Sequence, residues 1–104
     1  MILPFDHCSS IDALDENSRA EIMEFTNTAV SVLKMIYKPQ GFNVGMNIGD
    51  AAGAGIAEHL HMHVVPRWGG DTNFMTSLAK TRVLPEALDE TYRRVREEWE
   101  RSKE

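Results

Sequence analysis

The chain has 104 residues, a formal net charge of −5 and a hydrophobic content of 42%. This length suits a single small domain over residues 1–104, and the acidic balance argues against non-specific binding to nucleic acid. No apolar run approaches the roughly 18 residues that a membrane span needs, and the N-terminus lacks the features of a signal peptide. We therefore expect a cytoplasmic protein without a nucleic-acid or membrane partner.

The first half of the chain predicts a short strand followed by a long helix. Residues 1–4 read as a strand that a proline ends. Asp15 is a good N-cap for an amphipathic helix that runs to about Lys38, where Pro39 and Gly41 would end it. The residues that recur at helical spacing and would form its apolar face are Ile22, Met23, Thr26, Ala29, Val30, Leu33, Ile36 and Tyr37.

From Phe42 the hydrophobic period changes to two, which indicates a strand over residues 42–48. Its polar face would carry Asn43, Gly45 and Asn47. A loop of glycine and alanine residues, 49–55, leads from this strand into a second alternating segment, residues 59–65.

The second half predicts the end of that strand at Pro66 and a C-terminal helix with Pro85 in its first turn. Residues 72–81 between them read as irregular. One apolar stripe of the helix would consist of Leu84, Leu88, Tyr92, Val95 and Trp99. The order of elements predicts an α+β fold with a small antiparallel sheet of about three strands.

Three of the four histidines alternate with apolar residues in the segment 59–65. On a strand, His59, His61 and His63 would share one face, while the residues between them would face the core. The histidine side chain has a pKa of roughly 6.5, and its neutral form has one free lone pair. It can therefore act as a base, a metal ligand or a nucleophile. The segment therefore predicts a functional site.

A phosphate group would fit this site. One ring could attack the phosphorus while the flanking rings donate hydrogen bonds to its oxygens. Asn43 and Asn47 would add neutral donors from the next strand, and the loop 49–55 would let backbone N–H groups approach the phosphate.

Two other interpretations stay open. A purely structural role is less expected, because three alternating histidines are uncommon by chance. His-x-His pairs also bind zinc or iron. However, no acidic residue lies on the histidine face within the motif, since Glu58 would point to the opposite face of the strand. We therefore favour a phosphate site over a metal site.

The segment 59–65 resembles the signature of the histidine triad family of nucleotide hydrolases and transferases at every position. His7, which follows a proline-ended strand, resembles the family's upstream histidine. Residues 47–49 resemble its Asn-x-Gly segment, and residues 65–74 are similar to the branch related to diadenosine tetraphosphate phosphorylases. The similarity covers residues 1–85. It implies a histidine-triad fold that is shortened at its N-terminus, because the chain starts where a family domain is already under way.

The resemblance implies that His61 is the nucleophile on the α-phosphate of a dinucleoside polyphosphate, and that a covalent nucleotidyl-histidine forms. Phosphate or water would resolve it, with phosphorolysis slightly favoured over hydrolysis. His59 and His63 would hold phosphate oxygens. The other phosphate-binding residues would be His7, Asn43, Asn47, Gly53 and Gly55. No metal would be needed for the covalent step, although a divalent cation could accompany the nucleotide.

Two departures from the family pattern lead to alternatives. Many members carry glutamine in the loop before the triad, where this chain has Gly53 to Ile56, so a backbone N–H would have to make that contact. The family's N-terminal helix and hairpin, which form much of the base pocket, do not precede Met1. The alternatives are therefore a catalytically weak module that binds a nucleotide or a partner and, less favoured, a metal-dependent hydrolase. We also expect a homodimer, because a three-stranded sheet needs cover.

Overall fold

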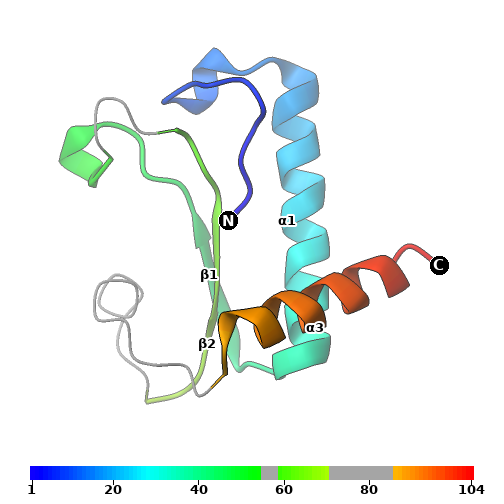
Figure 1. The fold of residues 1–104 in the computed structure, drawn as a ribbon. Coiled ribbons are helices and arrows are strands. Elements are labelled where there is room, and N and C mark those ends of the chain that lie inside the picture. Colours follow the sequence, from blue (N-terminus) through cyan, green and yellow to red (C-terminus); the bar gives the residue numbers. More distant parts are fainter. Residues whose placement is uncertain (55–58, 71–85) are drawn as a thin grey trace. The chain divides into compact units, whose positions relative to one another are not determined.

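The computed structural model describes residues 1–54, 59–70 and 86–104 (Figure 1). Its main elements are two helices and two strands, α1 (Glu16–Tyr37), β1 (Gly41–Gly45), β2 (His63–Arg67) and α3 (Leu88–Arg101). Two short 3₁₀ helices, η1 (Ile11–Ala13) and η2 (Asp50–Ala52), lie in the loops. The α+β fold class is confirmed. The predictions for residues 72–81, Pro85 and Gly55 lie outside the described residues.

The described chain divides into two compact units. The first unit comprises Met1–Asn27 and Val44–Val64, and the second comprises Thr28–Asn43 and Val65–Glu104. Contacts are described below within one unit or the other. None of the described helices combines the length and the apolar character that crossing a bilayer requires.

Helix α1 begins and ends where its sequence predicts. The Asp15 carboxylate accepts a hydrogen bond from the backbone N–H of Ser18 at 2.7 Å, which satisfies one of the free donors of the first turn. This bond to the charged form lowers the pKa of Asp15. At the other end, Lys38 takes a left-handed conformation with φ of 48°, and its N–H donates to the carbonyl of Lys34 at 3.2 Å.

The buried face of α1 differs from the predicted apolar face at two positions. Met23 is 58% exposed, so its assignment to that face is wrong. Val32, outside the predicted face, is only 1% exposed. Many side chains in the second half of α1 are half-buried, so the buried arc there is wide enough to include position 32. Thr26 tolerates burial because its hydroxyl donates to the carbonyl of Ile22 at 2.8 Å.

The sheet has two strands within the described residues, β1 paired with β2 in antiparallel fashion, instead of about three. Residues 1–4 contribute only an isolated antiparallel bridge between Ile2 and Met62. The ladder cannot continue past it, because Pro4 has no N–H to donate. Leu60, two residues before Met62, would pair with Pro4 in a continued ladder, but its N–H donates instead to the carbonyl of Cys8 at 2.7 Å.

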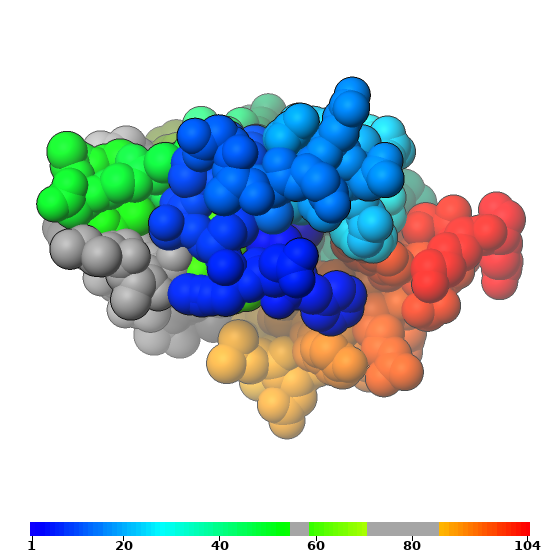
Figure 2. Space-filling model, turned by 90° about the horizontal axis from the view of Figure 1, so that it is seen from above, coloured from blue at the N-terminus to red at the C-terminus, as the bar shows by residue number. Residues whose placement is uncertain are grey.

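The core of the first unit is built where the histidine segment meets α1. Its buried side chains are Leu14, Ile22, Leu60 and Met62, and the partly buried Ile2, Cys8, Met46 and Val64 pack against them. The prediction that the apolar residues between the histidines face the core is therefore confirmed. The N-terminal segment, dark blue in Figure 2, lies at the surface, where Met1, Leu3 and Phe5 are exposed.

In the second unit, a polar clasp formed by Tyr37, Glu86, Thr91 and Arg94 holds α3 to the last turn of α1. The Glu86 carboxylate accepts hydrogen bonds from the Tyr37 hydroxyl at 2.5 Å, the Thr91 hydroxyl at 2.7 Å and the Arg94 guanidinium at 2.6 Å. The same guanidinium donates to the carbonyl of Ile36 at 2.9 Å. These hydrogen bonds, first that from Tyr37, lower the pKa of Glu86 to about 2.

The clasp orients α3 so that its half-buried face differs from the predicted stripe. Val95 and Trp99 are half-buried as predicted. Leu88 and Tyr92, however, are 84% and 65% exposed, so their assignment to a buried stripe is wrong. The half-buried face also includes Arg94, whose polar contacts fix the rotation of the helix.

Candidate active site

The histidine segment is strand only from His63 onwards. His59 and His61 precede β2, and Met62 forms the bridge to Ile2. The observed strand therefore starts later than the predicted one. The alternation of the side chains nevertheless persists. Leu60 and Met62 are 2% and 7% exposed and belong to the core, whereas His59 and His61 are only half-buried.

All four histidines belong to the first unit, where they form two ring pairs. The rings of His7 and His59 lie 5.1 Å apart between centroids and are tilted by 39°. The rings of His61 and His63 lie 4.4 Å apart and meet edge to face. The loop after Pro4 thus places His7 against His59, which lies 52 residues later in the sequence.

The Nδ1 atom of His61 lies 3.0 Å from the backbone carbonyl oxygen of His59. A carbonyl oxygen can only accept a hydrogen bond, so Nδ1 must carry the ring proton and donate it. Neutral imidazole carries one such proton, so Nε2 keeps its lone pair. The contact therefore selects the tautomer in which Nε2 can attack. Sequence reasoning could not assign this partner, because every residue has a backbone carbonyl.

The loop before the triad brings two predicted phosphate-binding residues together. The side-chain nitrogen of Asn47 lies 3.7 Å from the position that a Cβ atom on Gly53 would occupy. Gly49 and Gly53 have φ of 85° and 99°, which side chains other than hydrogen disfavour. The turn between them is closed by the N–H of Ala54, which donates to the carbonyl of Gly49 at 3.0 Å.

Asn43 is placed differently from the other predicted site residues. It belongs to the second unit, where its side-chain oxygen accepts a hydrogen bond from the Arg67 guanidinium. Together with Gln40, Arg67 and Trp68 it lines a shallow hollow. The contacts within the first unit thus join His7 to His59, His61 to His63, and Asn47 to Gly53. The phosphate-binding role of Asn43 stays a prediction.

The rival metal interpretation finds no ready-made ligand group in the described parts of the chain. Nowhere in residues 1–54, 59–70 and 86–104 are three or more histidine, cysteine or acidic side chains arranged to hold a metal ion. The groups that contact His61 among these residues are the ring of His63 and the backbone carbonyl of His59.

Known proteins provide an independent comparison. Residues 1–70 match the HIT domain. The chain is 46% identical over 101 residues to the AP-4-A phosphorylase of Mycobacterium tuberculosis, an alignment that covers 97% of this chain and 52% of that protein. It thus spans about half the length of this relative. An uncharacterized HIT-like protein of Mycoplasma genitalium is 27% identical, with 93% of this chain and 67% of that protein covered.

Solved structures agree in fold. A Zn-bound histidine triad family protein from Mycobacterium smegmatis superposes with a TM-score of 0.75 at 22% identity, covering 97% of this chain and 68% of that one. A hypothetical histidine triad nucleotide-binding protein from Sulfolobus tokodaii gives 0.73 at 25% identity with the same coverage. Since the HIT domain spans most of the chain and includes all four histidines, the chain belongs to the histidine triad (HIT) family.

Proposed function

We propose that this chain is a nucleotidyl hydrolase or transferase that cleaves a dinucleoside polyphosphate such as diadenosine tetraphosphate. The observation that carries the proposal is the contact between Nδ1 of His61 and the His59 carbonyl, which leaves Nε2 as a nucleophile. The 46% identity to an AP-4-A phosphorylase supports the choice of substrate. It also supports phosphorolysis slightly over hydrolysis.

In the proposed first step, Nε2 of His61 attacks the α-phosphorus. An N–P bond forms and the bond between phosphorus and the bridging oxygen breaks, so diadenosine tetraphosphate would lose ATP and leave AMP on His61. Positive charge develops on the ring as the N–P bond forms. The hydrogen bond from Nδ1 to the carbonyl dipole of His59 stabilises this charge.

In the second step, an oxygen of inorganic phosphate attacks the same phosphorus, the N–P bond breaks and ADP leaves. With water in place of phosphate, the product is AMP. The covalent step needs no metal in this scheme, and a divalent cation would enter only with the nucleotide. Activity that survives a chelator would support this, whereas its loss would favour the metal-dependent hydrolase.

His59 and His63 are proposed to donate hydrogen bonds to phosphate oxygens during both steps. Within the described residues, Nε2 of His59 is buried and has no hydrogen-bond partner, which is unusual for a buried polar atom. His7 supports the His59 ring by contact. The carboxamide of Asn47 and the backbone at Gly53 are proposed to line the approach of the phosphates. The proposed phosphate contacts of Asn43 and Gly55 rest on the sequence alone.

The products decide between the two acceptors. Turnover of diadenosine tetraphosphate in phosphate buffer should give ADP and ATP, whereas the same reaction without phosphate should be slower and give AMP and ATP. Equal rates and identical products in both conditions would rule out a phosphorylase and leave a hydrolase. No turnover in either condition would overturn the proposed function.

The exposed apolar side chains of Met1, Leu3 and Phe5 favour a second candidate. This candidate is a HIT module that binds a nucleotide or another protein but turns substrate over slowly. Calorimetric titration with AMP and with diadenosine tetraphosphate, beside the turnover assay, separates the two. Tight binding without turnover would favour the binding module.

A further inference from the structure

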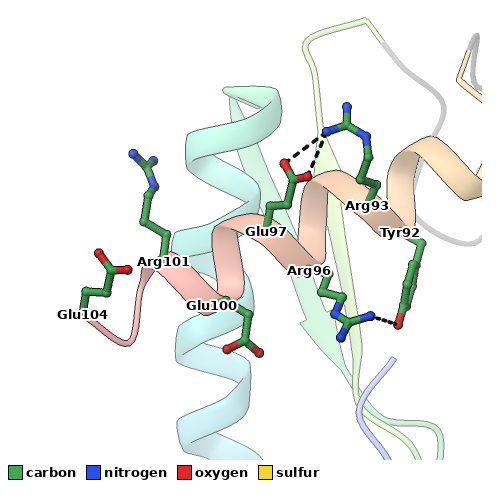
Figure 3. Close-up of a pocket in the computed structure, with 7 residues that line it drawn as sticks. All are labelled: Tyr92, Arg93, Arg96, Glu97, Glu100, Arg101 and Glu104. Carbon is green, nitrogen blue, oxygen red and sulfur yellow. Dashed lines mark hydrogen bonds and ion pairs between the residues drawn. The ribbon is translucent and has the colours of Figure 1, made fainter.

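The outward face of α3 carries two large apolar side chains one turn apart. Leu88 is 84% exposed and Tyr92 is 65% exposed. Figure 3 shows Tyr92 at the edge of a shallow hollow along this face, lined by seven residues of which none is a predicted site residue. Neighbouring exposed apolar residues mark an interaction surface more often than isolated ones do.

Two opposite charges flank Tyr92 on this face. Asp89 precedes Tyr92 by three residues and Arg96 follows it by four, so all three project from the same side of the helix. Both charged side chains are exposed, and within the described residues neither makes an ion pair. The sole hydrogen bond of Arg96 there is a long one, 3.5 Å, to the Tyr92 hydroxyl (Figure 3).

Neighbouring cations of α3 are different, because they already have acidic partners on the same helix. Arg93 pairs with Glu90 and Glu97, and Arg101 pairs with Glu98 at 2.7 Å. Asp89 and Arg96 are therefore the opposite charges on this face that remain available to a second molecule.

We propose that a second copy of this chain docks on this face, with the two α3 helices antiparallel and a twofold axis close to Tyr92. The axis would set Tyr92 of one copy against Tyr92 of the other, next to Leu88. It would also set Asp89 of each copy opposite Arg96 of the other. An isologous interface makes each contact twice, so two ion pairs would enclose a small apolar centre.

The charges also select the orientation of the helices. A parallel arrangement in register would place Asp89 against Asp89 and Arg96 against Arg96, and both contacts would be repulsive. One face of a 14-residue helix is smaller than the roughly 800 Å² per partner of a stable interface. We therefore expect a weak association that is seen at high protein concentration. The proposal does not depend on the proposed function.

Sedimentation equilibrium over a range of protein concentrations tests the pairing by charge reversal. Asp89→Arg and Arg96→Asp should each weaken the association by about tenfold, because two exposed ion pairs become two repulsive pairs. The double variant restores both pairs in the reversed sense and should associate like the unchanged chain. Single variants that leave the association unchanged, or a double variant as weak as the single ones, would overturn the proposal.

Glu21→Arg is the matched control, since Glu21 is an exposed residue of α1 without an ion pair among the described residues. It should leave the association unchanged, and a loss equal to that of the α3 variants would mean that net charge alone is responsible. Association through a different surface would be insensitive to Asp89 and Arg96 and would appear as a separate step. Circular dichroism verifies that each variant keeps its helix content.

A cross-linking experiment tests the position of the axis. In a Cys8→Ser background, Tyr92→Cys should oxidise rapidly to a disulfide-linked dimer, because an axis near this residue brings the two Cβ atoms within bonding range. Arg101→Cys, about two and a half turns further along α3, should cross-link far more slowly. Equal rates for the two variants would show random collision and contradict the proposed pairing.

Discussion

His59, His61 and His63 share one residue type and regular spacing, but their surroundings differ. His59 contacts His7, His61 donates to a backbone carbonyl, and His63 is the most buried of the three at 9% exposure. The contact with the His59 carbonyl fixes the tautomer of His61. The differences between the rings therefore come from their contacts and burial rather than from residue identity.

Replacing His61 by alanine removes the proposed nucleophile. Turnover of diadenosine tetraphosphate should fall by at least about a thousandfold, because loss of a nucleophile is among the most costly changes in an active site. The covalent adduct should also disappear from the mass spectrum of the quenched enzyme. Glu21→Gln, an exposed change on α1, should keep both. An adduct that persists in His61→Ala would assign the nucleophile elsewhere.

Asn47→Ala should lower kcat/KM by about ten- to a hundredfold, the value of one hydrogen bond to a charged group. The expectation rests on the position of the Asn47 carboxamide beside Gly53 in the loop before the triad. Steady-state kinetics of the variant measure it. Asn17→Ala, which removes an exposed asparagine of α1, should have no effect. Equal kinetics for both variants would remove Asn47 from the proposed phosphate site.

At the residue scale, the sequence predicted which side chains matter better than it predicted their partners. The motif and the position after Pro4 singled out the three alternating histidines and His7, and the structure pairs their rings. The carbonyl partner of His61 left no trace in the sequence, since a peptide group is the same at every position. Asn43 was grouped with Asn47 from strand alternation alone, which cannot register that Arg67 engages its side chain.

At the scale of elements, periodicity predicted the helices well and their buried faces less well. The Asp15 cap and the stop after Tyr37 are local signals, so the limits of α1 follow from them. The rotation of a helix depends on what packs against it. Val32 and Tyr92 show this, because one is buried and the other exposed against expectation.

Val32→Ala tests the observed rotation of α1. Removing two buried methyl groups should lower the free energy of unfolding by about 2 kcal/mol. Met23→Ala, at a position that is 58% exposed, should change it by less than about 0.5 kcal/mol. Urea unfolding followed by circular dichroism measures both. The reverse order would mean that α1 is rotated from the orientation described.

The clasp at Glu86 predicts how stability depends on pH. The pKa of Glu86 is lowered from 4.5 to about 2 in the folded chain. Its contribution is therefore complete above pH 4.5 and is lost as the pH falls towards 2. Urea unfolding at several pH values should show that Glu86→Gln flattens the decline of stability over this window. An unchanged decline would mean that the clasp does not form in solution.

At the scale of the whole molecule, the alternation of strand and helix periods was enough to predict the α+β class. Within residues 1–54, 59–70 and 86–104, residues 1–4 form a bridge rather than a third strand, because Pro4 lacks an N–H and the carbonyl of Cys8 competes as an acceptor. Such competition between acceptors is decided by tertiary structure. A period of two along the sequence cannot reveal it.

The exposed side chains of Val44 and Ile48, on and after β1, bear on the prediction of a homodimer. A second copy that covers such a surface would bury apolar area. Sedimentation velocity at micromolar concentration should give a dimer, and it should persist in Asp89→Arg because it uses a different surface from α3. A monomer at every concentration would contradict this prediction and the proposed α3 contact together.

The acceptor of the His61 hydrogen bond is a main-chain carbonyl, so it does not depend on which amino acid stands at position 59. Any amino acid at position 59 still supplies that carbonyl oxygen, and a substitution there removes an imidazole without removing the acceptor. Position 59 therefore makes two contributions, its imidazole ring and its carbonyl oxygen, and mutation affects them differently. The ring can be lost by a single mutation, whereas the orientation of the nucleophile is lost only if the backbone itself changes course.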